Sequence, residues 1–325
     1  MGTLNLAAMA SLHDHSGAIS IAQLDHCVVS RRLRQELITD KILIPVHRGV
    51  YRIASQPLTL ATRCAALSLF LPTGYVTGPT GGKHFELRRM PTTQTKPPKK
   101  SKEKPIEIVH YAMPHPMRMS IPGVKIRQTT IIEPTDRFTS LGGILLASPW
   151  RLAFDLAGDL GPLDLASVIE QILANKLCTV VTLAATSRRL SHPARPGSKE
   201  FAAALASRVP GGPLESHPEV RVAKALRDLG IPIVAQVTWL DLPDGTKARL
   251  DISVPAVRWG LEVDVHPDHF LLFGSADRYR DRQCNQVGWQ VNRVTAVEML
   301  DFDALMADLV RTYEARVAEI SGRGR

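Results

Sequence analysis

Three acidic residues in the C-terminal part of the chain have the types and spacing of a metal site. Asp251 lies in an expected strand, residues 248–254, whose alternating apolar residues leave it on the polar face. The next expected strand, residues 258–265, carries Glu262 and Asp264 together on its polar face. If the two strands pair, the three carboxylates converge.

Carboxylates gathered beside a sheet repel one another and lose hydration, so a cation is expected to compensate them. Mg²⁺ or Mn²⁺ is the natural choice, because such hard cations take carboxylates, waters and phosphate oxygens as ligands. We therefore expect Asp251, Glu262 and Asp264 to bind the metal and to support hydrolysis of a phosphodiester bond. The alternative is that these acids lie on a solvated strand face.

Further acid–base groups lie close to this pair of strands in sequence. Glu219 follows Ser216 in a Ser-x-x-Glu pattern that opens an expected helix. It is either part of a capping box or a further member of the acidic cluster. His266 and His269 follow the second strand, where an imidazole can assist proton transfer, although a surface role is the alternative.

Basic residues follow the acids. Arg278 and Arg282 lie one turn apart on an expected helix, residues 276–287, and Arg293 lies on the strand after it. Their guanidinium groups are expected to contact the phosphates of a nucleic acid. Ion pairing of the helix arginines with neighbouring aspartates is the alternative.

The N-terminal residues 4–55 have the pattern of a winged helix-turn-helix, with three short helices followed by a two-stranded hairpin. Ser30 is expected to cap the third helix, residues 31–40, which would read a DNA groove. The expected contacts to phosphates or base edges come from Arg31, Arg32, Arg34 and, at the wing tip, Arg48. The alternative is a protein-interaction module whose arginines are solvated.

Composition limits the classes of function. The 325 residues are enough for two or three domains, and a net charge of +9 with a pI near 9.6 favours a polyanionic partner. No apolar run approaches the roughly 18 residues of a membrane span, and the N-terminus lacks the pattern of a signal peptide. Four widely spaced cysteines form no zinc module and favour a cytoplasmic location.

The sequence divides into three expected domains. Residues 1–56 form the winged helix-turn-helix, residues 57–212 an α/β middle region with a basic Pro/Lys loop at 91–105, and residues 213–325 the acidic-site domain. The glycine-rich residues 78–83 do not match the spacing of a phosphate-binding loop and are predicted to be a connecting turn.

The C-terminal pattern resembles a known nuclease family. Asp251, ten intervening residues and Glu262-Val263-Asp264 resemble the PD-(D/E)xK motif, in the variant of the very-short-patch-repair endonuclease-like domains that ends in an acid. The resemblance covers residues 213–315, and the strand at 288–295 is similar to the family's GWxVxRxT strand. It implies a restriction-endonuclease-like α/β fold with a mixed sheet, and gives Glu219 the role of a further acid. The chain differs from the family in lacking the motif Lys and the following Gly.

The N-terminal segment through Arg48-Gly49-Val50-Tyr51-Arg52-Ile53 resembles the N-terminal domain of the abortive-infection (AbiEi-like) type IV antitoxins. This resemblance implies DNA as a partner and adds a toxin as a second one. The function expected from both resemblances is that of a DNA-binding protein with a metal-dependent endonuclease-like domain, in phage defence or toxin–antitoxin regulation. The alternative is a non-catalytic antitoxin or transcriptional regulator that binds DNA through its winged helix.

Overall fold

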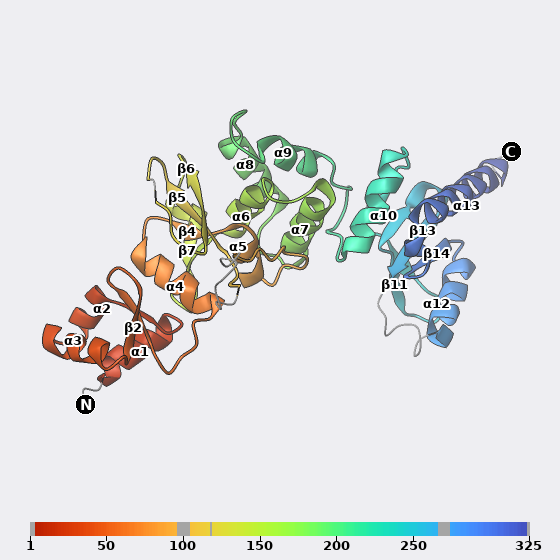
Figure 1. Cartoon of the computed structure of the whole chain (residues 1–325). Coiled ribbons are helices and arrows are strands. Elements are labelled where there is room, and N and C mark those ends of the chain that lie inside the picture. Colours follow the sequence, from red (N-terminus) through yellow and green to blue (C-terminus); the bar gives the residue numbers. More distant parts are fainter. Residues whose placement is uncertain (1–3, 96–104, 118, 266–273, 324–325) are drawn as a thin grey trace. The chain divides into compact units, whose positions relative to one another are not determined.

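The computed structural model describes residues 4–95, 105–117, 119–265 and 274–323, without the side chains of residues 274–278 and 323. Most of the basic loop at 91–105 therefore lies outside the described residues. The chain forms two compact units (Figure 1): Met1–Asp159 with Ala185–Ser198, and Leu160–Ala184 with Lys199–Arg325. Both units are mixed α+β, and the domain boundary expected at residue 213 lies inside the second unit.

The N-terminal part of the first unit contains the three expected helices. Its elements are α1 (Leu6–Asp14), β1 (Ala18–Ser20), α2 (Ile21–His26), α3 (Arg31–Thr39), β2 (Leu43–His47) and β3 (Val50–Ile53). Ser30 caps α3 as predicted, since its hydroxyl accepts from the Leu33 amide at 3.2 Å. β1 was not expected, and it completes an antiparallel three-stranded sheet in the order β1-β3-β2.

The rest of the first unit is built on a five-stranded mixed sheet in the order β6-β5-β4-β8-β7. Its elements are α4 (Leu60–Phe70), β4 (Tyr75–Val76), α5 (Gly78–His84), β5 (Val109–Pro114), β6 (Val124–Thr129), β7 (Arg137–Thr139), β8 (Leu145–Ala147) and α6 (Pro149–Leu156). Helix α4 packs its apolar side chains against this sheet and against β1 and β3.

The prediction of a turn at residues 78–83 was wrong, because these residues form helix α5. The glycines allow close packing: a Cβ at Gly81 would lie 2.9 Å from Leu152 of α6, and one at Gly82 would collide with Met90. Pro79 is compatible with the first turn, where the backbone amide makes no helical bond. Tertiary packing therefore outweighs the low helix propensity of glycine here.

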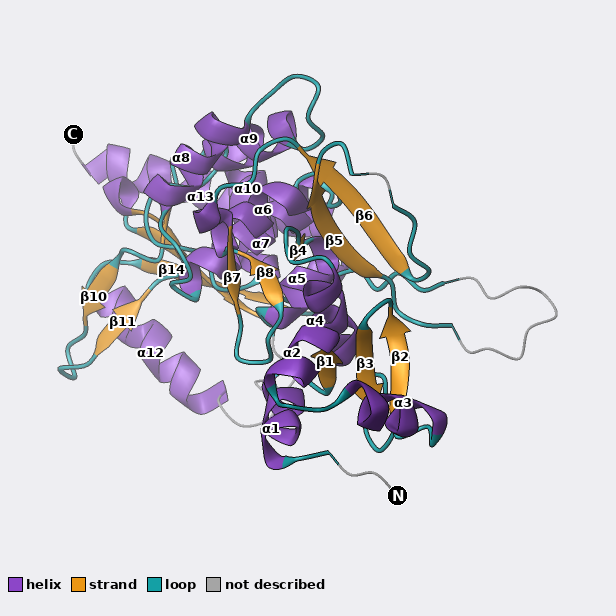
Figure 2. Ribbon diagram, turned by 90° about the vertical axis from the view of Figure 1, so that its left-hand side faces the viewer, coloured by secondary structure: helices purple, strands orange, loops and turns teal. Residues whose placement is uncertain are grey.

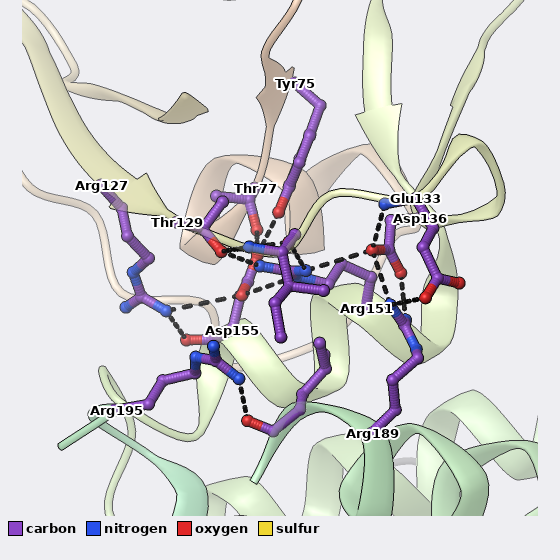
Figure 3. Close-up of polar contacts among 12 residues, drawn as sticks. Tyr75, Thr77, Arg127, Thr129, Glu133, Asp136, Arg151, Asp155, Arg189 and Arg195 are labelled. Carbon is purple, nitrogen blue, oxygen red and sulfur yellow. Dashed lines mark hydrogen bonds and ion pairs between the residues drawn. The ribbon is translucent and has the colours of Figure 1, made fainter. Parts of the chain in front are cut away.

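A buried network of arginine and aspartate side chains connects α6 to the rest of the first unit (Figure 3). Arg151 is 1% exposed and contacts Asp136 at 3.2 Å and Asp155 at 3.1 Å. Arg189, near the end of α8 (Val180–Leu190), also pairs with Asp136, and Thr77 donates to Asp155 at 2.7 Å. Each buried carboxylate is thus matched by several donors, which is the condition for tolerating its burial.

The second unit contains the expected acidic region. Its elements are α7 (Pro162–Ala174), the first residues of α8, α9 (Ser198–Ala206, with Ser198 itself in the first unit), α10 (His217–Asp228), β9 (Val234–Ala235), β10 (Trp239–Asp241), β11 (Lys247–Arg249), β12 (Ile252–Val254), β13 (Trp259–Asp264), α12 (Gly274–Gln286), β14 (Gln290–Thr295) and α13 (Phe302–Arg323). Helices α10 and α13 share a core with the sheet, centred on the fully buried Trp259 and Leu261. The sequence did not predict α13.

The second unit has a four-stranded mixed sheet in the order β14-β13-β12-β9. β12 is antiparallel to β9 and β13, whereas β13 and β14 are parallel and connected through α12. Strands β10 and β11 form a separate hairpin whose inner face packs on α12 around Cys284, and Figure 2 shows the hairpin and α12 side by side.

The strand predicted at residues 248–254 is not continuous. It divides into β11 and β12 at Leu250 and Asp251, because the residues before the break pair with β10 and those after it pair with β9 and β13. Asp251 therefore lies where the chain passes from the hairpin to the four-stranded sheet.

Candidate acidic site

The strand register makes Asp251 and Glu262 neighbours. Ile252 of β12 pairs with Leu261 of β13, so Asp251, which immediately precedes β12, comes opposite Glu262 of β13. The Val263 amide donates to Asp251 Oδ2 at 2.9 Å, which fixes the aspartate against β13. Glu262 is 8% exposed. Two of the three expected acids therefore lie together beside the sheet.

Glu219 joins this pair through Gln236. The Gln236 amide Nε2 donates to Glu219 Oε2 at 2.9 Å and to Asp251 Oδ1 at 3.0 Å. Glu219 Oε2 also accepts from the Glu215 amide at 3.0 Å, while Ser216 Oγ accepts from the Glu219 amide at 3.3 Å. The full capping box does not form, because the Glu219 carboxylate accepts from the Glu215 amide and not from that of the N-cap Ser216; through Gln236 the carboxylate reaches the acidic cluster.

Two arginines contact Glu262. Arg280 Nη2 of α12 lies 2.8 Å from Glu262 Oε1, and Arg293 Nη2 of β14 lies 3.0 Å from Glu262 Oε2. Arg293 is the register partner of Glu262 in the parallel strand pair, and it also pairs with Asp281 of α12 at 3.1 Å. Arg293, expected to bind phosphate, is therefore an ion-pair partner of the acids.

Burial dominates the electrostatics of the cluster. It raises the pKa values of Glu219, Asp251 and Glu262 above their ordinary range, and the negative charge of Asp251 raises those of the two glutamates further. The Val263 amide and Gln236 oppose the rise in the pKa of Asp251, as the two arginines do for Glu262, but neither set outweighs burial. The ionised cluster is thus undercompensated, a condition typical of functional sites.

The expected site of three carboxylates does not form. Among the described residues, no group of three His, Cys, Asp or Glu side chains is arranged to hold a metal ion. Glu262 and Asp264 share a face of β13. His266 and His269 lie outside the described residues.

The pair of Asp251 and Glu262 still fits a Mg²⁺ ion, because this cation commonly takes only one or two carboxylates and keeps several waters. Each Asp251 oxygen accepts one protein hydrogen bond, and a carboxylate oxygen has two lone pairs. Asp251 and Glu262 are therefore the candidate ligands, although both Glu262 oxygens already contact arginines.

The other arginines expected to bind DNA have different surroundings. Arg31 and Arg48 are exposed, and Arg32 forms an exposed pair with Glu36 at 3.0 Å. Arg34 does not point outward as expected, because it pairs with Asp25 at 3.0 Å and its side chain is only 13% exposed.

Helix α12 presents Arg282 to solvent, with its guanidinium 5.8 Å from the centre of the Tyr279 ring. The side chain of Arg278 lies outside the described residues. Gln236 and Arg280 are members of the site that were not predicted from the sequence. The spacing of Arg278, Arg280 and Arg282 was the available signal, because residues two apart on a helix face different directions.

Comparison with known proteins adds no assignment: no family model matches this chain, and a search of the curated proteins finds no match. In the part of the chain that the structure describes, no helix combines the length and apolar character needed to cross a membrane.

Proposed function

We propose that this chain is a DNA-binding protein whose second unit is a metal-dependent phosphodiester hydrolase of the PD-(D/E)xK type. The observation that carries the proposal is the adjacency of Asp251 and Glu262 on paired strands, both with pKa values raised by burial. The order of α10, the antiparallel strands that bear the acids, the crossover helix α12 and the parallel strand β14 supports a restriction-endonuclease-like fold.

In this proposal Asp251 and Glu262 hold Mg²⁺ or Mn²⁺, which supplies an activated water and neutralises charge on the phosphate. Gln236 and the Val263 amide orient Asp251 through its two oxygens. Arg280 and Arg293 stand beside Glu262, where their donors can bind the oxygens of a scissile phosphate. These arginines replace the motif Lys as the source of positive charge.

The N-terminal part supplies DNA binding in the proposal. A capped third helix followed by the β2–β3 hairpin supports a winged helix-turn-helix, in which α3 enters a groove. Arg31 on α3 and Arg48 at the hairpin turn are exposed and positioned for phosphate contact. A cytoplasmic role in phage defence or toxin–antitoxin regulation belongs to the same proposal.

A second candidate is a non-catalytic antitoxin or transcriptional regulator. One observation favours it: both oxygens of Glu262 are engaged by arginines, so the acidic cluster is partly neutralised without a cation. In that case the second unit would contribute to binding of a partner, such as a toxin, and the N-terminal part would bind the promoter.

A cleavage assay tests the first candidate. Supercoiled, linear duplex, mismatched and single-stranded DNA are incubated with the purified full-length chain and Mg²⁺ or Mn²⁺. We expect cutting by the wild type, its loss in Asp251→Asn, and its retention in Asp241→Asn, because Asp241 is an exposed aspartate of the same unit. Titration with Mn²⁺, followed by electron paramagnetic resonance, measures metal binding independently of activity.

The second candidate predicts different results. No substrate is cut, and binding to the chain's own promoter persists in EDTA but weakens in the double variant Arg31→Ala, Arg48→Ala. Each substituted arginine contributes to counterion release, so the salt dependence of binding should also become less steep. Metal-independent promoter binding together with absent cleavage would therefore replace the hydrolase proposal.

A further inference from the structure

An exposed tryptophan lies on the hairpin next to the acidic cluster. Trp239 of β10 is 58% exposed, whereas Leu240 is 5% exposed. The alternation of the strand explains the difference, because the inner face of the hairpin packs on α12 and the outer face meets solvent. The Trp239 indole is a large apolar group, and in this position much of its surface remains in solvent. Packing of the unit therefore does not explain its position.

A positive charge accompanies this ring. The Arg249 guanidinium carbon lies 5.9 Å from the centre of the Trp239 ring, within the range of a cation–π contact. Arg249 is the register partner of Trp239 across the hairpin, and it also pairs with Glu215 at 2.7 Å. An aromatic face and a guanidinium are thus presented together on the outer face of the hairpin.

Backbone hydrogen bonds fix this pair relative to the acids. The Leu250 amide donates to the Thr238 carbonyl at 3.0 Å, and the Gln236 amide donates to the Asp251 carbonyl at 3.0 Å. Two residues separate Trp239 from Gln236, and one separates Arg249 from Asp251. Because strand residues rise about 3.3 Å each, the indole lies within a few nucleotide lengths of the carboxylates.

We propose that Trp239 and Arg249 form a stacking platform for an unpaired base of a single-stranded nucleic acid whose backbone reaches the acidic cluster. This inference rests on the proposed function and specifies its substrate class. A base can stack its flat face on an indole only when it is not stacked on neighbouring bases. A base inside a closed duplex therefore cannot bind to the platform. Arg280, whose Nη2 lies 3.4 Å from the Arg249 carbonyl oxygen, adds a positive charge for the phosphates of such a strand.

Fluorescence anisotropy tests the platform without requiring catalysis. A labelled single-stranded oligonucleotide and the duplex of the same sequence are titrated with the full-length chain in EDTA. Loss of one base–aromatic stack weakens binding by roughly five-fold to a hundred-fold, so we expect Trp239→Ala to weaken single-strand binding by about ten-fold. Duplex binding should stay unchanged, and Trp239→Phe should retain most of the affinity for the single strand.

Leu229→Ala is the matched control, because Leu229 is an apolar residue of the same unit with a similar exposure of 60%. It should leave both affinities unchanged. Quenching of the wild-type fluorescence by the single strand, absent in Trp239→Phe, reports stacking directly. Circular dichroism of each variant checks that the fold is retained.

Equal single-strand affinities of the wild type, Trp239→Ala and Trp239→Phe would overturn the platform. If Trp239→Ala changes the oligomeric state in solution but leaves the nucleic-acid affinity unchanged, the platform is also overturned. The indole would then be assigned to a contact between protein chains. Asp251→Asn separates the two proposals. If this variant keeps Trp239-dependent binding of the single strand, and neither it nor the wild type cuts DNA, the platform stands and the hydrolase proposal fails.

Discussion

Replacing Glu219 by glutamine should stabilise the second unit at neutral pH. Both hydrogen bonds that this carboxylate accepts, from the Glu215 amide and from Gln236 Nε2, go to the same oxygen, Oε2. A glutamine can offer its carbonyl oxygen at that position, so Glu219→Gln preserves these bonds while removing a buried charge next to Asp251. A residue that costs stability where it stands is expected at a functional site.

The sign of the pH dependence follows from the pKa of Glu219, which burial and the charge of Asp251 raise. A carboxyl group whose pKa is raised in the folded state stabilises that state fully below its unfolded-state pKa. This stabilisation is lost as the pH rises through the folded-state pKa. Each pKa unit between the folded and the unfolded state corresponds to about 1.4 kcal/mol of stability. The stability advantage of the variant should therefore be smallest near pH 4 and grow as the pH rises toward neutrality.

Hydrogen–deuterium exchange of the β12 and β13 amides measures the stability of the second unit alone, in EDTA and between about pH 5 and pH 8. The control is Glu314→Gln on α13, an exposed glutamate whose substitution should change the free energy of opening by less than about 0.5 kcal/mol. A Glu219→Gln variant that is less stable than the wild type at neutral pH, or an advantage that does not vary with pH, would refute the electrostatic account of the cluster.

Two further substitutions test the first unit. Arg151→Met leaves the fully buried Asp136 with one arginine fewer, so we expect the free energy of unfolding in urea to fall by about 3–5 kcal/mol. The control, Arg32→Met, removes an exposed ion pair and should cost less than about 1 kcal/mol. Gly74→Ala should cost about 1–3 kcal/mol, because its Cβ would collide with the Ala112 carbonyl oxygen, whereas Gly322→Ala, with no atom within 4 Å, should be neutral or stabilising by the same measurement.

Local sequence rules predicted the N-terminal elements well because their determinants are local. Ser30 caps α3 through its own hydroxyl, and Gly49 adopts a φ of +76° in the hairpin turn. The same applies to the neighbouring positions of Asp251 and Glu262, which follow from period-two alternation once the strands pair.

Non-local determinants were not predictable in this way. The contact of Arg280 with Glu262 depends on how α12 crosses between two parallel strands, which no local pattern in the sequence specifies. Helix α5 forms from a glycine-rich segment because residues distant in sequence pack closely on it. The third carboxylate, Asp264, shares a face with Glu262, but strand alternation does not specify the side-chain conformations that would bring both to one cation.

The Arg151 network and the acidic cluster both combine buried carboxylates with arginines, but they differ in their electrostatic balance. Burial alone would raise the pKa of Asp136, but hydrogen bonds from Arg189 and the Glu133 amide, with the charge of Arg151, lower it overall. In the second unit burial prevails, and the pKa values of Asp251 and Glu262 remain raised. A carboxylate whose charge is matched by the fold has a structural role, whereas one whose charge is unmatched gains most from a ligand. By this criterion added positive charge would stabilise Asp251 and Glu262 more than Asp136, which already contacts Arg151 and Arg189.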